Sequence, residues 1–236
     1  CSYCYNSYKN SWKTMSAEKI VNIILHIKKS IPMVDSITFV DDNFMVKYDR
    51  VLKFVNLLKE NKIKIKWSCE TDLRTIKKFL DNNILEYLVE NGLYWISPGI
   101  ETASKKISFE IGKKIDFDEI MDINIKLGKY NLYVKYNFMT GYYNETKSDI
   151  MKTLSLTKNL LNTNNKALIQ PLQVCVPYPG TKYLEMSENY GFVMPKKLVD
   201  WINFNPEDWI NFVPWIKNKY RNYLKNVFIT SIFIDK

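Results

Sequence analysis

Segments typical of strands and of helices alternate along most of this chain. The β-branched and aromatic runs predict strands at 35–40, 64–69, 93–97, 132–139 and 167–176, the first of them buried. Amphipathic segments predict helices between and after them, at 19–29, 49–61, 76–91 (in two pieces), 117–130, 147–161 and 182–190. This alternation predicts βαβ units, a parallel sheet and right-handed crossovers that curl the strands one way round.

Unusual residues gather just after each predicted strand. Because parallel α/β folds place their sites at the carboxyl ends of strands, we expect these residues to meet at one mouth. Turn chemistry is the alternative for the glycines, and helix N-capping is the alternative for the acids, Asp42 above all. The residues concerned are Asp41, Asp42, Glu70, Arg74, Glu101, Gly141 and the turn Pro177-Tyr178-Pro179-Gly180.

The chain opens on two cysteines, Cys1 and Cys4, in a C-x-x-C spacing. Such a pair can hold a metal or an iron–sulfur cluster from one tight loop, or act as a redox dithiol. Because the chain begins on a candidate ligand and has no initiator methionine, we expect further residues before Cys1, including one more strand. Cys69 and Cys175 fall in predicted strands, where small buried cysteines are usual, although Cys175 could face the cavity.

Composition narrows the function classes. Four cysteines in 236 residues do not make a disulfide framework, which favours a reducing, cytoplasmic location. The net charge of +9 comes almost entirely from dispersed lysines, because the arginines are Arg50, Arg74 and Arg221; nucleic-acid binding is therefore disfavoured. The single histidine, His26, lies off its helix's apolar stripe and is predicted to be a surface residue. No apolar run reaches the ~18 residues of a membrane span.

The alternation stops after residue 192. Residues 193–236 are rich in aromatic side chains, with some helical character. We expect this extension to pack against the preceding domain, 1–192; a base-stacking platform is the alternative, and it requires exposed rings.

Several motifs resemble the radical S-adenosylmethionine (SAM) enzymes, and among them the cobalamin-binding branch. The hallmark loop of that family is C-x-x-x-C-x-aromatic-C, and Cys1-Ser2-Tyr3-Cys4 matches its last four positions. The resemblance to this branch covers about residues 1–192, and its motifs occur in the same order as in the family. The motifs are Cys4-Tyr5-Asn6, Trp12, Ser16, Phe39-Val40-Asp41-Asp42-Asn43-Phe44, Gly99-Ile100-Glu101-Thr102, Phe138-Met139-Thr140-Gly141 with Glu145-Thr146, and Pro177-Tyr178-Pro179-Gly180-Thr181 before Gly191.

The resemblance implies a partial (β/α)6 TIM-like barrel whose first strand precedes Cys1. Three thiolates would hold a [4Fe–4S] cluster, and SAM would chelate its remaining iron. One electron, from a donor such as flavodoxin or ferredoxin, would cleave SAM to a 5′-deoxyadenosyl radical that attacks the substrate. A cobalamin-binding domain would precede the barrel, and methyl transfer or radical rearrangement would follow.

The resemblance also implies roles for single residues. Cys1 and Cys4 would be cluster thiolates, and the missing third would stand four places before Cys1. Tyr3 would lie near the adenine. Asp41 and Asp42 would meet the amino group of SAM, Glu101 its ribose or amino-acid end, and Arg74 its carboxylate. The Pro177–Gly180 turn would shape the floor near the adenine.

Two other function classes remain open. A zinc-stabilised binding module would use Cys1, Cys4, Cys69 and Cys175, although these cysteines are widely spaced for a closed tetrahedral site. An RNA-modifying, methylthiotransferase-like relative would share the cluster loop but would carry a basic RNA-binding barrel. The sequence leaves the substrate undefined, as a small molecule or a peptide.

Overall fold

A parallel sheet forms the centre of the computed structural model, which describes residues 1–4, 13–114, 116–202, 213–216 and 218–232. Within these residues six strands pair in parallel, in the order β1-β2-β3-β4-β5, with β6 pairing the far end of β4. The predicted α/β fold class, a partial barrel of parallel strands, is thus confirmed. The strands are β1 Ser36–Phe39, β2 Lys66–Thr71, β3 Leu93–Glu101, β4 Tyr133–Thr140, β5 Ala167–Ile169 and β6 Gln173–Val174.

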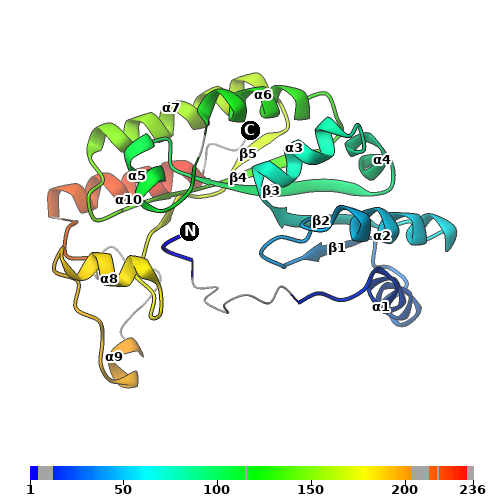
Figure 1. The fold of residues 1–236 in the computed structure, drawn as a ribbon, viewed down its shortest axis with the longest axis horizontal. Helices are drawn as coiled ribbons and strands as arrows, with labels where there is room; N and C mark the ends of the chain where they lie inside the picture. Colours follow the sequence, from blue (N-terminus) through cyan, green and yellow to red (C-terminus); the bar gives the residue numbers. More distant parts are fainter. Residues whose placement is uncertain (5–12, 115, 203–212, 217, 233–236) are drawn as a thin grey trace.

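Helices follow the strands and cover the convex face of the curved sheet, while Cys1 lies on the concave side (Figure 1). Side-chain caps fix where several of them begin; Ser16 accepts from Lys19 N, and Asp72 accepts from Thr75 N. The helices are α1 Ala17–Ser30, α2 Tyr48–Glu60, α3 Leu73–Asp81, α4 Leu85–Glu90, α5 Lys105–Glu110, α6 Phe117–Leu127, α7 Lys147–Thr163, α8 Lys182–Glu188, α9 Leu198–Ile202 and α10 Asn218–Ile232.

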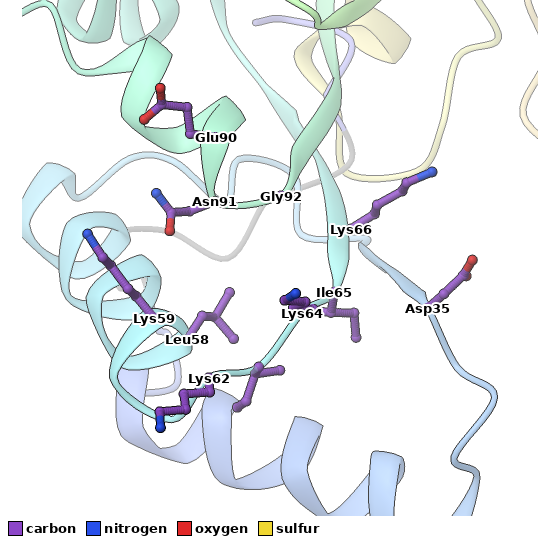
Figure 2. Close-up of a pocket in the computed structure, with 11 residues that line it drawn as sticks. Asp35, Leu58, Lys59, Lys62, Lys64, Ile65, Lys66, Glu90, Asn91 and Gly92 are labelled. Carbon is purple, nitrogen blue, oxygen red and sulfur yellow. The ribbon is translucent and has the colours of Figure 1, made fainter.

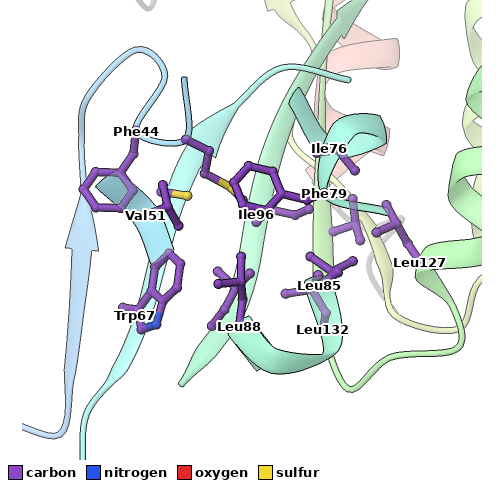
Figure 3. Close-up of a cluster of buried hydrophobic side chains, with 14 of the residues drawn as sticks. Phe44, Val51, Trp67, Ile76, Phe79, Leu85, Leu88, Ile96, Leu127 and Leu132 are labelled. Atoms are coloured by element: carbon purple, nitrogen blue, oxygen red, sulfur yellow. The ribbon is translucent and has the colours of Figure 1, made fainter. Parts of the chain in front are cut away.

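The main core lies between the sheet and these helices (Figure 3). In β4 the residues alternate, so that Val134, Tyr136 and Phe138 are buried while Lys135 and Asn137 point to the other face. Trp67 of β2 is fully buried against Phe44 and Phe54. The concave face therefore carries the strands' polar residues, and those residues are available for binding.

Four sequence predictions of the sheet need correction. The first strand, predicted to be buried, is an edge strand of the sheet in which Ser36 and Thr38 are exposed. β3 does not end at Ser97 but runs on through Pro98 and Gly99 to Glu101. Pro98 stands in register with Thr71, the last residue of β2. Glu70 lies within β2 and not after it. The predicted strand 167–176 divides into β5 and β6 around Pro171, whose ring removes a backbone donor.

The described part of the C-terminal extension packs on the barrel. Trp215 Nε1 donates to the Gly141 carbonyl oxygen at 2.8 Å, and Ile216 and Leu224 join Ile150 of α7 in a buried cluster. Three aromatic residues of the extension, at positions 204, 209 and 212, lie outside the described residues, as do residues 5, 6 and 12 of the opening motif. His26 is exposed on α1, as predicted. None of the described helices is both long and apolar enough to cross a bilayer.

Candidate functional site

A cavity of about 690 Å³ opens at the carboxyl ends of β2, β3 and β4. Six of the residues singled out from the sequence line it together: Cys1, Tyr3, Asp42, Glu70, Arg74 and Glu101. They come from four separate segments of the chain. The expectation that residues from different segments meet at one mouth therefore holds for these six residues.

The cysteine loop is fixed to this mouth by backbone hydrogen bonds. Ser2 N donates to the Ile111 carbonyl oxygen at 2.8 Å, and its own carbonyl oxygen accepts from Tyr183 N at 2.9 Å. Cys4 N donates to the Cys1 carbonyl oxygen at 3.3 Å, which closes a tight turn between the two thiols. Both thiols are free and exposed. The loop thus presents two thiolate donors on the concave side.

The turn that ends α5 lies beside Cys1. Gly112 has a φ of +73°, which favours glycine, and a Cβ placed there would lie 3.9 Å from the Cys1 Cα. The sequence predicted neither this helix nor the turn. A short helix capped by Ser104 therefore supports the cysteine loop from below.

Glu101 is the most buried acid of the cavity and is held in an unusual backbone conformation. Its φ is +71°, in the left-handed region, and its side chain is only 10% exposed. Lys113 Nζ lies 2.5 Å from Glu101 Oε1, so the buried charge is paired. Lys113 was missed from the sequence, because only the fold of 102–112 brings it back to the end of β3.

Tyr3 completes this group from the cysteine loop. Burial, followed by the charge of Glu101 and a hydrogen bond with it, raises the pKa of the Tyr3 phenol well above its usual range. Tyr3 therefore stays a neutral hydrogen-bond donor. Tyr3 and Lys113 thus both contact Glu101, and Cys1 lines the same cavity.

Three polar residues of the strands form the inner wall of the cavity. Asn137 Nδ2 donates to Ser97 Oγ at 3.0 Å and to Glu70 Oε2 at 3.4 Å. Burial raises the pKa of the Glu70 carboxyl, against these hydrogen bonds and the nearby charge of Lys135. Ser97 and Asn137 were missed from the sequence, although their alternation with buried apolar residues along β3 and β4 could have indicated an inward direction.

The loop after β1 is organised by Asn43. Asn43 Nδ2 donates to Asp72 Oδ2 at 2.7 Å, and its Oδ1 accepts from Met45 N at 3.1 Å. This arrangement turns Asp42 toward the cavity. Some of the predicted site residues are not among the residues that line it; these are Cys4, Asp41, Pro177 and Gly180.

A buried acid stands beside the site. Glu145 Oε2 accepts from Thr140 Oγ1 at 2.7 Å and from Gly141 N at 2.6 Å. Its Oε1 and the nearby Tyr142 hydroxyl are buried and find no hydrogen-bond partner among the residues that the structure describes. Burial raises the pKa of the Glu145 carboxyl to about 7, although both hydrogen bonds oppose this. The carboxyl therefore titrates near neutrality.

A second cavity, of about 640 Å³, lies at the opposite end of the strands (Figure 2). Lysines from α2 and from the start of β2 surround it, and Gly92 lies at its edge before β3 begins. It contains none of the predicted site residues. The chemistry predicted from the sequence therefore belongs to the cavity beside Cys1.

The four cysteines do not gather into one site. Cys69 is buried in the main core and Cys175 in a separate apolar cluster beside Tyr183, whereas Cys1 and Cys4 are exposed. Among the described residues no three Cys, His, Asp or Glu side chains converge on one point. A four-cysteine zinc site is thus not assembled, and Cys1 and Cys4 stand together as a pair of exposed sulfur donors.

The sequence profile of the Radical SAM superfamily matches residues 1–157, which is more than half of the chain. The chain belongs to the radical SAM superfamily. Its members are enzymes, and the family implies SAM and a [4Fe–4S] cluster as cofactors.

Individual relatives agree with this assignment. An uncharacterized methyltransferase of Pyrococcus horikoshii is 25% identical over 189 residues, which cover 78% of this chain and 39% of the relative. The chain thus spans about two fifths of the length of that curated relative. The fold is similar to that of OxsB, described as a cobalamin-dependent SAM radical enzyme, with a TM-score of 0.63 at 16% identity over 80% of this chain and 33% of that one.

A third relative has the same fold. Coproporphyrinogen III oxidase (HemN) from Escherichia coli, described as a radical SAM enzyme, has a TM-score of 0.57 at 14% identity, over 90% of this chain and 49% of HemN. At these identities the two solved structures establish the fold, and the radical SAM partial barrel is confirmed.

Proposed function

We propose that this chain is the catalytic barrel of a radical SAM enzyme that transfers a methyl group with the help of cobalamin. The observation that carries the proposal is the meeting of Cys1, Tyr3, Glu101 and Lys113 at one cavity. The methyl transfer draws on the resemblance to the cobalamin-binding branch, and the description of a relative as a methyltransferase supports it. The cobalamin domain would lie outside residues 1–236.

The residues of the chain would divide the work between two cofactors. Cys1 and Cys4 would ligate two irons of the cluster, with a third thiolate from outside these residues. The cluster, when bound, supplies the electron that cleaves the sulfonium of SAM, after delivery by a donor such as flavodoxin or ferredoxin. Asp42 would accept hydrogen bonds from the amino group of SAM, and Arg74 would meet its carboxylate.

The remaining cavity residues would orient the nucleoside end. Glu101, held by Lys113, would accept from the ribose hydroxyls, and the neutral Tyr3 phenol would lie beside the adenine. Asp41 would meet the amino group of SAM beside Asp42, and the Pro177–Gly180 turn would approach the adenine, although neither lines the cavity.

The test uses the full-length protein, reconstituted with iron and sulfide under anaerobic conditions. A reduced sample given SAM should form 5′-deoxyadenosine, and Cys4→Ala should lose bound iron together with this product. Cys69→Ala provides the matched control, because Cys69 is buried in the main core and should leave the iron content unchanged. Formation of no 5′-deoxyadenosine by the reconstituted parent protein would contradict the proposal.

The methyl-transfer component has its own test. Full-length protein purified with added hydroxocobalamin should retain the cobalamin in a defined stoichiometry, which visible absorption measures. A protein that forms 5′-deoxyadenosine but retains no cobalamin would remain a radical SAM enzyme of a different branch.

A further inference from the structure

The concave face of the sheet carries charged and aromatic side chains below the cysteine cavity. Strand register places Glu70 of β2 beside Ser97 of β3, and Ser97 Oγ donates to the Lys135 carbonyl oxygen of β4 at 3.0 Å. Glu70, Ser97 and Lys135 thus form one row across three adjacent strands. The acid and the lysine stand two strand spacings apart, which is roughly 9–10 Å between backbones.

Aromatic rings lie next to this row, toward the amino-terminal ends of β3 and β4. Lys135 Nζ is 4.4 Å from the ring centroid of Trp95, which is half-buried on the same face. Trp95 pairs in register with Tyr133, whose side chain is 47% exposed. Two partly exposed aromatic side chains on neighbouring strands offer an apolar platform to a ligand.

Lys135 makes no direct ion pair with any residue in the part of the chain that the structure describes, although its charge acts on the Glu70 carboxyl at longer range. Lys113 of the same mouth, by contrast, is paired. Glu70, on the other side of Ser97, has hydrogen bonds with the neutral side chains of Ser97 and Asn137. Within the described residues the row therefore has a positive end without an ion pair and a negative end that only neutral hydrogen-bond donors contact.

This row lies within reach of the proposed cofactor cavity. Asn137 and Gly99 follow Lys135 and Ser97 by two residues on their strands, a rise of about 6.6 Å. Glu70, Ser97, Asn137 and Gly99 line the same cavity as Cys1. A molecule lying on the row would extend toward the cysteine loop.

We infer that this row is the substrate subsite and that it selects a planar zwitterion, with an anionic group on Lys135, its ring on Trp95 and Tyr133, and a protonated amine on Glu70. The inference rests on the proposed function for its meaning, because the subsite would hold the molecule that the radical attacks. Its chemistry follows from the two opposite charges and the aromatic platform between and below them. Burial of each charge is offset only when the ligand supplies its partner.

Three small probes test this assignment in the full-length protein without cluster or SAM, by calorimetry or ligand-observed NMR. The probe 4-(aminomethyl)benzoate carries ring, anion and ammonium, while 4-methylbenzoate and benzylamine each lack one charge. The zwitterion should bind about tenfold tighter than either truncated probe, the usual effect of one charge-assisted contact.

Variants then assign each end of the row. Lys135→Met should reduce the affinity of 4-(aminomethyl)benzoate to that of benzylamine, and Glu70→Gln should reduce it to that of 4-methylbenzoate. Lys59→Met is the matched control, since Lys59 lies over the Tyr87 ring at 5.7 Å on a distant helix, and it should change nothing. Lys135→Gln serves if the methionine variant does not fold.

Equal binding of the three probes, binding of none of them, or an equal loss in Lys59→Met would overturn the inference. These outcomes are independent of the proposed function. A protein that fails to form 5′-deoxyadenosine contradicts the radical chemistry, whereas the probes measure only the chemical preference of the row.

Discussion

Lys113 Nζ lies 2.5 Å from Glu101 Oε1, and this ion pair ties the turn after α5 to the end of β3. Glu101 reaches it from a backbone conformation that non-glycine residues rarely adopt. A buried pair in such a position fixes where the carboxylate points. We expect the pair to position Glu101 for SAM, because Tyr3 and Cys1 border the same cavity.

Lys113→Met should weaken SAM binding to the reconstituted full-length protein by about tenfold or more, since it leaves a buried carboxylate without its partner. Equilibrium dialysis with labelled SAM measures the change. Lys129→Met, at an exposed lysine after α6, should leave the affinity unchanged. Equal affinities for parent and Lys113→Met would show that the pair is structural only.

Gly99→Ala should displace the same pair without altering its charges. A Cβ at residue 99 would collide with Glu101 Oε1 and would lie 2.8 Å from Lys113 Nζ, so both side-chain ends must shift. SAM affinity should therefore fall, while the melting temperature stays close to that of the parent. Gly128→Ala is the control, because its Cβ would meet only neighbours at 3.4 Å, in ordinary contact. Unchanged affinity in Gly99→Ala would contradict the positioning role.

The sequence could predict the acid of this pair but not its lysine. Glu101 is recognisable as an acid that ends a strand, and the order of strands and helices follows from periodicity and capping residues such as Ser16. Lys113 depends on the path of 102–112, a short helix and a glycine turn whose direction is set by tertiary packing. Ser97 was missed because Pro98-Gly99 looked like the end of a strand that in fact continues, whereas Asn137 lies inside the predicted strand 132–139 and could have been found from its alternation with buried apolar residues.

Glu145→Gln should make the protein more stable at neutral and alkaline pH. Burial raises the pKa of this carboxyl from its ordinary 4.5 to about 7, so the folded state holds its proton more tightly than the unfolded state does. The resulting stability is fully present below about pH 4.5 and is lost as the pH rises through 7, a change of about 3 kcal/mol. The amide keeps an oxygen acceptor for Thr140 and Gly141 and removes this loss.

Urea unfolding at a series of pH values measures the effect. The parent's free energy of unfolding should fall between pH 4.5 and 7 relative to that of Glu145→Gln, and the two curves should separate over this window. Glu188→Gln, at an exposed acid of α8, should follow the parent curve. Parallel curves for parent and Glu145→Gln would show that the carboxyl titrates normally.

Asn124→Leu should destabilise the barrel far more than Tyr136→Phe. The buried Asn124 amide donates to the Leu160 carbonyl oxygen at 2.9 Å and to Thr163 Oγ1 at 2.8 Å, and its oxygen accepts from the Tyr136 hydroxyl at 2.8 Å. Leucine leaves the buried Tyr136 hydroxyl and the Leu160 carbonyl oxygen without that partner, at about 3 kcal/mol, whereas phenylalanine removes one donor at about 1 kcal/mol.

Urea titration at constant pH measures both variants and the double variant. Because the two side chains share one hydrogen bond, the combined loss should be smaller than the sum of the single losses. Additive losses would mean that α6 is joined to β4 by apolar packing alone. The coupling matters for the site, since β4 carries Lys135 and Asn137 on its opposite face and the Asn124 network sets the position of that strand.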